Sequence, residues 1–248
     1  MNPAQEPLKL VIDLGNSRAK VAVYEGNELM SLQIVENPTP EKFSALTLDE
    51  LNLTAGIISS VAGDPTSYTA VYPGLNWIVL DSDTAVPIIN NYETPETLGK
   101  DRLAAVTAAH LLHPGKDMLV IDAGTAITYD FINRDGVYSG GSISPGLAMR
   151  FNSLHTFTRR LPLLQTQEID YLIGRNTNES ILSGVINGIR CEIDGIIDQY
   201  RLSWPELRIL LTGGDTKYFE KTLKNNIFAT PNLVLTGLKL ILDYNLEK

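Results

Sequence analysis

Two stretches of this chain follow the same pattern, and their repetition constrains the fold more than any other feature of the sequence. "VIDLGNSRAK" at residues 11–20 and "VIDAGTAITYD" at residues 120–130 each begin as an apolar strand and end in Asp-x-Gly and a polar turn. Asp13 and Asp122 are 109 positions apart (122 − 13). Apolar runs that are closed by Gly, Asn or Ser are typical of strands that enter a turn. The sequence therefore predicts one structural device that is used twice.

The segments around both stretches repeat the same order of elements. The pattern predicts strands at 8–13, 19–25, 29–36, 55–61, 76–81, 117–122, 126–132, 136–144 and 207–214, and helices at 40–46, 177–200, 215–225 and 232–246. Asn176 and Glu179 resemble a capping box at the start of the long helix. Strands that alternate with helices indicate a sheet that is covered on both faces, so the fold class is α/β. The repeated order predicts two similar domains, 1–100 and 101–248, with a single doubly wound sheet as the alternative.

Composition narrows the class of protein. The 248 residues suffice for one large domain or two ordinary ones, and the formal net charge of −9 argues against a nucleic-acid partner. The chain shows neither a signal-peptide pattern nor an apolar run that could cross a membrane, so no membrane partner is expected. Its single cysteine, Cys191, cannot form an internal disulfide, which favours a cytoplasmic protein.

Several familiar signatures of catalysis are absent from the sequence. It contains no Walker phosphate loop, no G-x-G-x-x-G, no H-E-x-x-H and no protein-kinase set. The histidines, His110, His113 and His155, have no cysteine or carboxylate at zinc spacing. The Asp-x-Gly pair is therefore the main candidate for chemistry.

The residue types of the first turn suit a nucleotide phosphate. Gly15 allows the backbone to approach a ligand closely, and Asp13 at the strand end can hold a magnesium ion, directly or through water. The turn also carries small donors and positive charge, in Asn16, Ser17, Arg18 and Lys20.

The second turn repeats this arrangement with Asp122, Gly124 and Thr125. Two such turns that face each other across a cleft would hold a phosphate chain and its metal from both sides. The alternative for either turn alone is an ordinary β-turn, because Asp, Gly, Asn and Ser are the usual turn residues. Their matching places in two repeated halves favour the binding interpretation.

The paired turns resemble the phosphate-binding hairpins of the superfamily of acetate and sugar kinases, Hsp70 and actin. Within it, nearly the whole chain resembles the type III pantothenate kinases. The matching segments, in family order, are "DLGNS", "NNYETPETLGKDR", "IDAGTAITYD", "GGSISPG", "TFTRRLP", "TNESILSG" and "LTGGD". Ser17 departs from the usual threonine of the family but keeps the hydroxyl group.

This resemblance implies two actin-like (ribonuclease H-like) domains, each a mixed sheet flanked by helices, with an ATP cleft between them. It implies ATP-dependent phosphorylation of pantothenate to 4′-phosphopantothenate, the first step of coenzyme A biosynthesis. The expected cofactors are Mg²⁺ with ATP and a monovalent cation, K⁺ or NH₄⁺. The expected partners are ATP, pantothenate and a second copy of the chain.

The segment "GKDR" offers a residue that could orient the acceptor hydroxyl. Gly99 precedes a helix that begins near Lys100 or Asp101, and the helix dipole favours a carboxylate in that first turn. An ionised Asp can accept a hydrogen bond from a hydroxyl, and phosphoryl transfer needs little more than such positioning. The resemblance gives Asp101 the role of catalytic base and Arg102 that of binding the pantothenate carboxylate. The alternative is a helix-start carboxylate with a solvated neighbour.

The resemblance implies further site residues. The expected ATP-binding residues are Asp13, Leu14, Gly15, Asn16, Ser17, Arg18, Ala19, Lys20 and Thr125, and the expected substrate-binding residues are Tyr92, Gly99, Lys100, Asp101, Arg102 and Thr177. Asp122 is expected to bind the monovalent cation. Thr177 is expected to reach the substrate site of the partner subunit. Gly184 and Gly188, four apart in the long helix, favour close helix packing at a dimer interface.

Two other functions remain open from the sequence. A non-catalytic regulator on the same scaffold is one, because the family includes proteins described as accessory transcription factors. The acidic balance and the presence of Asp13, Asp101, Arg102 and Asp122 argue against it. Another small-molecule kinase or phosphatase of the superfamily is the second, and "GKDR" with its preceding tyrosine counts against that.

Overall fold

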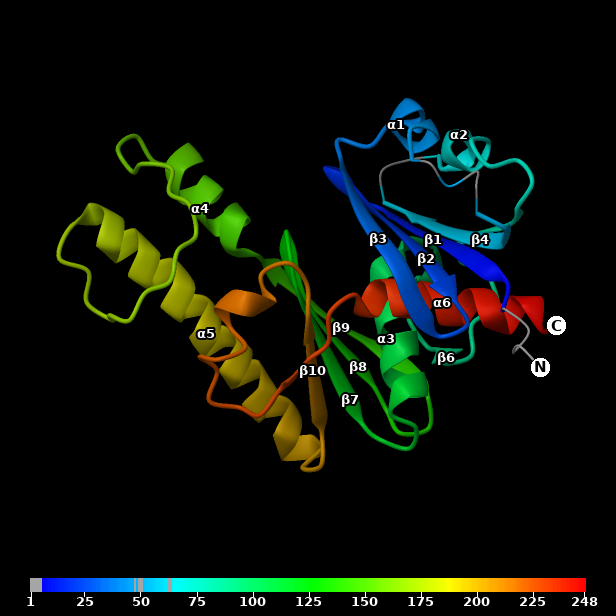
Figure 1. The fold of residues 1–248 in the computed structure, drawn as a ribbon. Coiled ribbons are helices and arrows are strands. Elements are labelled where there is room, and N and C mark those ends of the chain that lie inside the picture. Colours follow the sequence, from blue (N-terminus) through cyan, green and yellow to red (C-terminus); the bar gives the residue numbers. More distant parts are fainter. Residues whose placement is uncertain (1–5, 47, 49–50, 62–63) are drawn as a thin grey trace. The chain divides into compact units, whose positions relative to one another are not determined.

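The computed structural model describes residues 6–46, 48, 51–61 and 64–248. Contacts divide the chain into two compact units (Figure 1). One contains Met1–Leu112 together with Leu233–Lys248, and the other contains His113–Asn232. The first unit is therefore built from two separate parts of the sequence, and the second unit from one continuous part.

The first unit contains a five-stranded mixed sheet in the order β3-β2-β1-β4-β5. Its strands are β1 (Leu8–Leu14), β2 (Arg18–Glu25), β3 (Glu28–Glu36), β4 (Leu53–Ser60) and β5 (Asn76–Val79). Strands β1, β2 and β3 form an antiparallel meander, whereas β4 runs parallel to both β1 and β5. This unit also holds the two-residue strand β6 (Ile89–Asn90) and the short 3₁₀ helix η1 (Pro95–Thr97).

The strands of the second unit repeat this topology in the order β11-β10-β7-β8-β9. They are β7 (Met118–Ala123), β8 (Ala126–Ile132), β9 (Val137–Pro145), β10 (Arg208–Thr212) and β11 (Phe228–Ala229). Strands β7, β8 and β9 again form an antiparallel meander, and β10 runs parallel to β7 and β11. The two repeated halves and the predicted strands are thus present, with ends that differ by a few residues.

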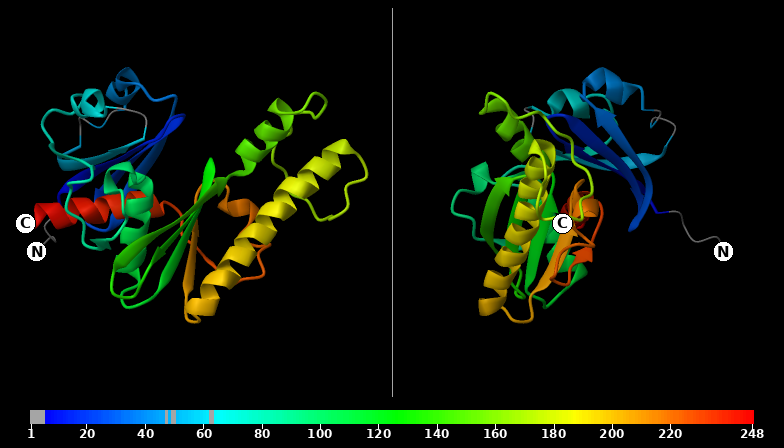
Figure 2. Two further views of the ribbon diagram at one scale, coloured as in Figure 1. Left: turned by 180° about the vertical axis from the view of Figure 1, so that it is seen from behind. Right: turned by 90° about the vertical axis from the view of Figure 1, so that its left-hand side faces the viewer.

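Helices cover both faces of the first sheet. Leu10, Ile12 and Leu14 of β1 point to one face and share a core cluster with Phe43 of α1 (Pro40–Ser44). Alternate residues of a strand point to opposite faces, so β1 also buries Val11 on the other side. Helices α3 (Lys100–Leu112) and α6 (Leu233–Leu246) pack against that side and against each other (Figure 2). The short helix α2 (Thr66–Thr69) contacts α1.

The long helix α5 (Thr177–Ser203) supplies most of the helical core of the second unit. Its isoleucines at 181, 186, 189, 193 and 197 recur at helical spacing and are buried in the same cluster as the strands. Asn176 is its N-cap, and Asn176 Oδ1 accepts a hydrogen bond from the Glu179 amide at 3.0 Å. Helix α4 (Leu147–Thr156) packs against α5. Within the part of the chain described here, no helix combines the length and apolarity that a membrane crossing demands.

The division of the chain differs from the boundary that the sequence predicts at residue 100. That prediction assigns α3 and α6 to the second domain, whereas by contacts both belong to the first unit. The reason is the apolar surface of α6. Leu233, Leu235, Leu238 and Leu242 are fully buried, and α6 packs on α3, β1 and β4.

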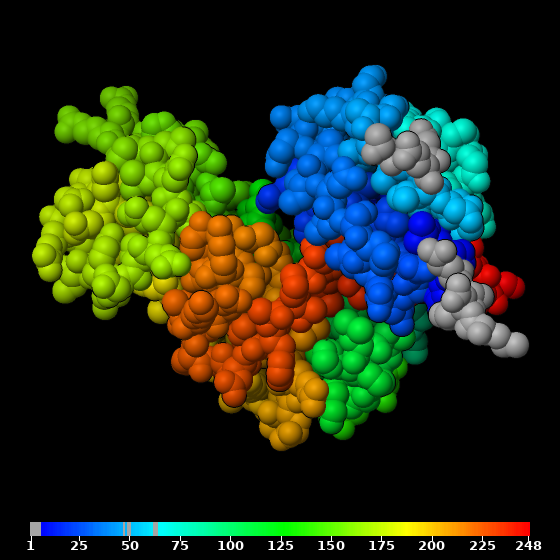
Figure 3. All heavy atoms as spheres, viewed as in Figure 1, coloured from blue at the N-terminus to red at the C-terminus, as the bar shows by residue number. Residues whose placement is uncertain are grey.

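The prediction of a helix at residues 215–225 is wrong. Only the 3₁₀ helix η2 (Thr216–Tyr218) forms there, and turns follow it. The backbone amides of Lys224 and Asn225 donate to the Asp194 carboxylate at 3.1 Å each, so they are paired with α5 and not within a helix. Tertiary hydrogen bonds and the burial of Phe219 outweigh the local helical preference. Atoms of this segment form part of the surface of the second unit (orange in Figure 3).

Candidate active site

The first Asp-x-Gly turn places one carboxylate at the end of a buried strand. Asp13 is the last but one residue of β1, and Ser59 of the parallel strand β4 is its register partner. Ser59 Oγ donates to Asp13 Oδ1 at 3.0 Å. Burial raises the pKa of Asp13 and the negative charge of Asp101 adds to this, while the Ser59 hydrogen bond and Lys20 act in the opposite direction. The surroundings of Asp13 thus oppose its ionisation, as is common at functional sites.

The rest of this turn presents polar groups to solvent. Asn16, Ser17 and Arg18 are exposed, and the Gly15 amide donates to the Arg18 carbonyl at 3.0 Å, which closes the turn. Leu14 and Ala19 are buried register partners below it. Lys20 of β2 is the register partner of Asp13 on the other side from Ser59. Donors and cations therefore surround the turn at which Asp13 lies, as an anionic ligand requires.

Asp101 lies in the first turn of α3, as the sequence predicts. The Gly99 carbonyl accepts the first hydrogen bond of that helix from the Leu103 amide, at 3.2 Å. Asp101 Oδ1 accepts from the Arg102 amide at 2.8 Å. Asp101 is close enough to Asp13 for its charge to raise the pKa of Asp13. Two carboxylates from distant parts of the sequence therefore influence each other electrostatically within the first unit.

Arg102 follows Asp101 in sequence, and its guanidinium lies over the ring of Tyr92. The Arg102 side chain is buried, with 6% of its surface exposed, and its Cζ atom lies 5.6 Å from the centre of the Tyr92 ring. A guanidinium over an aromatic face gains a cation–π attraction that holds it in one orientation. Lys100 is half-buried, and its charge assists the hydrogen bond from Thr84 in lowering the pKa of Asp81.

The second Asp-x-Gly turn belongs to the second unit. Asp122 is near the end of β7, and its register partners are Thr212 on β10 and Thr128 on β8. Gly213 has φ +98°, and a Cβ atom there would lie 2.4 Å from Asp122 Oδ1, so only glycine leaves room for this carboxylate. Thr125 is exposed at the tip of the turn. The arrangement matches that of Asp13 and Ser59, with a hydroxyl residue on the parallel neighbouring strand in both units.

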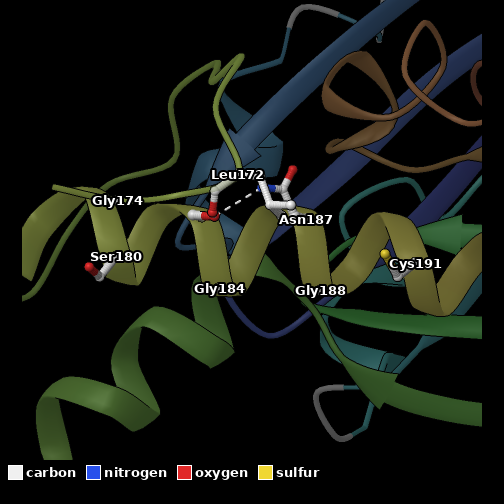
Figure 4. A pocket seen from close by; sticks show the side chains of 8 residues that line it. Leu172, Gly174, Ser180, Gly184, Asn187, Gly188 and Cys191 are labelled. Atoms are coloured by element: carbon white, nitrogen blue, oxygen red, sulfur yellow. Dashed lines mark hydrogen bonds between the residues drawn. The ribbon is translucent and has the colours of Figure 1, made fainter.

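Thr177 begins α5, and a hollow lies next to it on the same helix. The hollow has a volume of about 450 Å³ and is lined by Leu172, Gly174, Ser180, Ser183, Gly184, Asn187, Gly188 and Cys191. Figure 4 shows Gly184 and Gly188 along α5 between Ser180 and Cys191. A Cβ atom at either glycine would meet no other atom within 4 Å. This face of α5 is therefore open in the single chain, and Cys191 is exposed.

The number of carboxylates near Asp13 limits the kinds of metal ion that this site could bind. Among the described residues, no group of three or more His, Cys, Asp or Glu side chains could hold a metal ion by itself. Asp13, with Asp101 nearby, suits an ion such as Mg²⁺, which takes one or two carboxylates and completes its shell with waters and phosphates.

The structure brings Asp13, Tyr92, Asp101 and Arg102 into the first unit, and Asp122, Thr125 and Thr177 into the second. Ser59 is a hydrogen-bond partner of Asp13 that the sequence analysis missed. The rule that found Asp13, a polar residue at the end of an apolar strand, applies equally to "AGIISS".

Comparisons with known proteins point to one family. A family model described as type III pantothenate kinase matches residues 9–199. A type III pantothenate kinase of Christiangramia forsetii is 45% identical over 240 residues, which cover 96% of this chain and 99% of that protein. The resemblance inferred from the sequence motifs is confirmed, and the matches give no support to the regulator.

Solved structures with the same fold come from more distant proteins. A putative Baf family transcriptional activator from Campylobacter jejuni matches with a TM-score of 0.63 and 23% identity, covering 96% of this chain and all of that one. An inorganic polyphosphate/ATP-glucomannokinase from Arthrobacter sp. matches with a TM-score of 0.52 and 15% identity, covering 98% and 100%. At these identities the likeness concerns the fold alone. It confirms the predicted α/β class of two actin-like mixed sheets flanked by helices.

Proposed function

This chain belongs to the type III pantothenate kinase family, and from that premise we propose how its residues carry out the reaction. The enzyme uses ATP to phosphorylate pantothenate to 4′-phosphopantothenate, the first step of coenzyme A biosynthesis, and ATP acts with a divalent metal ion. The observation that carries our assignment of residues is the start of α3, where Asp101 is followed by the buried Arg102 and the guanidinium lies 5.6 Å from the centre of the Tyr92 ring.

Asp101 is the proposed catalytic residue. As a carboxylate it accepts the hydrogen bond of the primary hydroxyl of pantothenate and directs that oxygen at the γ-phosphate. A weak base suffices, because phosphoryl transfer depends on alignment and charge stabilisation. Arg102 binds the carboxylate of pantothenate through its planar pair of donors, and Tyr92 keeps the guanidinium in place. Gly99 and Lys100 complete the proposed substrate site.

The two turns are proposed to bind ATP. Residues 13–20 contact the phosphates, Asp13 holds Mg²⁺ directly or through water, and Thr125 contacts the nucleotide from the second unit. Mg²⁺ would neutralise charge on the transferring phosphoryl group.

Asp122 is proposed to bind K⁺ or NH₄⁺. If K⁺ binds there, replacing K⁺ by Na⁺ should lower the ADP-release rate, and equal rates would count against a selective site.

We also propose that the enzyme works as a homodimer in the cytoplasm, where its single cysteine stays reduced. The open face of α5 at Gly184 and Gly188 supports a second copy at this place, and Thr177 then contributes to the substrate site of the partner. Analytical ultracentrifugation of Gly188→Glu tests this, because a charged side chain on the interface should shift the species from dimer to monomer.

A coupled ADP-release assay tests the assignment of Asp101. Asp101→Asn removes the accepting charge but preserves the shape, so turnover with pantothenate should fall by about a hundredfold or more, because general base catalysis typically contributes at least that much. ATP affinity, measured by titration calorimetry, should change little. Asp135→Asn is the matched control, because Asp135 is an exposed carboxylate in the turn between β8 and β9.

Turnover of Asp101→Asn near the level of the unmodified enzyme would remove Asp101 from the mechanism. An equal loss in Asp135→Asn would show that the assay responds to net charge and not to the site.

A further inference from the structure

A polar network in the second unit joins helix α5 to the segment that follows β9. Arg150 of α4 donates through Nη2 to Glu192 Oε2 of α5 at 2.5 Å and to Ser144 Oγ at 2.9 Å. Its Nε donates to the Pro145 carbonyl at 2.7 Å. Tyr129 of β8 donates its hydroxyl to the other oxygen of Glu192 at 2.9 Å. The Arg150 guanidinium thus bridges helix α5 and the last two residues of strand β9.

The end of β9 and the N-cap residue of α4 support the Gly124–Thr125 turn. Gly146, next to Pro145, donates its amide to the Thr125 carbonyl at 3.1 Å. A Cβ atom at Gly146 would lie 2.1 Å from the Gly124 carbonyl oxygen and 2.6 Å from that of Thr125. The backbone at residue 146 therefore lies directly against the turn at 124–125. Residues 124–125 are thus held in part by the backbone at residue 146.

The surroundings of Glu192 favour its ionised form, and both of its carboxylate oxygens accept hydrogen bonds. Partial burial opposes ionisation of Glu192, but hydrogen bonds from Arg150, Ser144 and Tyr129 outweigh it and lower the pKa of this carboxyl. Burial and the Glu192 charge raise the pKa of Tyr129, which therefore stays a donor. About a quarter of the Arg150 and Glu192 side chains is exposed, 22% and 26%. Charge-assisted hydrogen bonds of this kind are short and strongly directional.

We infer that Arg150 is a positioning residue for ATP: by joining Glu192 of α5 to the end of β9, it holds the Gly124–Thr125 turn where that turn contacts the nucleotide. This inference rests on the proposed contact between Thr125 and ATP. The path runs from Glu192 to Arg150, to the Pro145 carbonyl, and through Gly146 to Thr125. Arginine is needed because only its planar group reaches three acceptors in fixed directions.

Steady-state kinetics of Arg150→Met test the inference. Methionine keeps much of the side-chain length but loses all three hydrogen bonds, so kcat/KM for ATP should fall roughly tenfold or more, the scale of misplacement effects from outside a site. KM for pantothenate should stay within about twofold. Arg150→Lys keeps the charge and should recover part of the loss. Lys224→Met is the matched control, because Lys224 forms an exposed ion pair with Asp198 of α5 at 2.6 Å.

Glu192→Gln provides a second variant if Arg150→Met folds poorly, because glutamine keeps one oxygen that can accept from Tyr129 but loses the charge and the second acceptor, which Arg150 uses. The combined effect of both substitutions on kcat/KM for ATP should be smaller than the product of the single effects. The inference is overturned if folded Arg150→Met or Glu192→Gln has normal kcat/KM for ATP, or if both substrates are affected equally. Thr125→Val distinguishes a failure of the proposed contact between Thr125 and ATP from a failure of the positioning role of Arg150. If it leaves the ATP constants unchanged, the ATP assignment of the turn fails; if it impairs them and Arg150→Met does not, the positioning role fails.

Discussion

The carboxyl group of Asp13 is in surroundings that oppose its ionisation. Burial is the main cause, and Asp101 adds a second negative charge. In the folded protein the proton is therefore held more tightly than in the unfolded chain. A raised pKa contributes stability below the unfolded pKa and loses that contribution as the pH rises through the folded pKa. At neutral pH the ionised Asp13 thus lowers the stability of the free enzyme, and bound cation would relieve this.

Asp13→Asn should therefore raise the melting temperature of the ligand-free protein at pH 7, while kcat/KM for ATP collapses. The gain should shrink as the pH falls towards about 4, because Asp13 takes up its proton in the folded state before it does so in the unfolded chain. Thermal melts between pH 4 and pH 8 measure this. Asp135→Asn should show no such pH-dependent gain. A stabilisation of Asp13→Asn that grows towards acid pH would contradict the argument.

At the residue level, the sequence predicts the site where one local rule suffices. Asp13, Asp122 and Asp101 follow from strand ends and a helix start, and the structure places them at those positions. Arg150 and Glu192 do not follow from any local pattern. They are 42 residues apart and belong to two helices, so only the tertiary structure shows that they meet.

At the level of elements, glycines in helices have opposite meanings in the two units. Gly237 of α6 lies against α3, and a Cβ atom there would be 1.8 Å from the Ala104 carbonyl oxygen. Gly195 of α5 is exposed and has no such neighbour within 4 Å. The first glycine is required by close packing between helices, and the second lowers the helical preference of α5 without a packing role.

Gly237→Ala should lower the free energy of unfolding by about 1–3 kcal/mol, because the added methyl group forces α3 and α6 apart. Gly195→Ala should raise it by roughly 0.5–1 kcal/mol through helix propensity alone. Urea unfolding followed by circular dichroism measures both. A change of the same sign in the two variants would show that the contact between Gly237 and Ala104 is not the cause.

Local sequence patterns predict most of the elements but fail for the helix expected at residues 215–225. Strands such as β8 and helix α5 have strong periodic patterns and a clear cap, so local rules locate them. Residues 215–225 have helical composition, but their amides pair with Asp194 instead. A sequence pattern describes neighbours along the chain, so it does not predict a hydrogen-bond partner that lies on another element.

At the scale of the whole molecule, the first unit depends on a helix that lies far from it in sequence. Helix α6 buries Leu233, Leu235, Leu238, Ile241 and Leu242 completely. Lys9 of β1 also forms an ion pair with Asp243 at 2.6 Å. The sequence pattern predicts this helix. The unit to which it belongs depends on the apolar surface that it covers, and only the packed structure shows which surface that is.

Removal of residues 233–248 should therefore unfold the first unit. Five buried aliphatic side chains at about 1.5–3 kcal/mol each amount to roughly 10 kcal/mol, which is comparable to the stability of an entire domain. Far-UV circular dichroism and limited proteolysis would show the loss. Removal of Glu247 and Lys248 alone, which are exposed and follow α6, should leave both signals unchanged. A folded, protease-resistant first unit without α6 would contradict this account.

The discontinuous first unit also sets an order of events during synthesis. Residues 113–232 leave the ribosome before residues 233–248 do, so the nascent first unit lacks α6 until the second unit has emerged. At about 5–20 residues per second, this interval lasts on the order of ten seconds. During that time the apolar side of β1 and α3 has no cover of its own. A chaperone that binds nascent chains would find its target there, and translation speed through the second unit would influence the yield of folded enzyme.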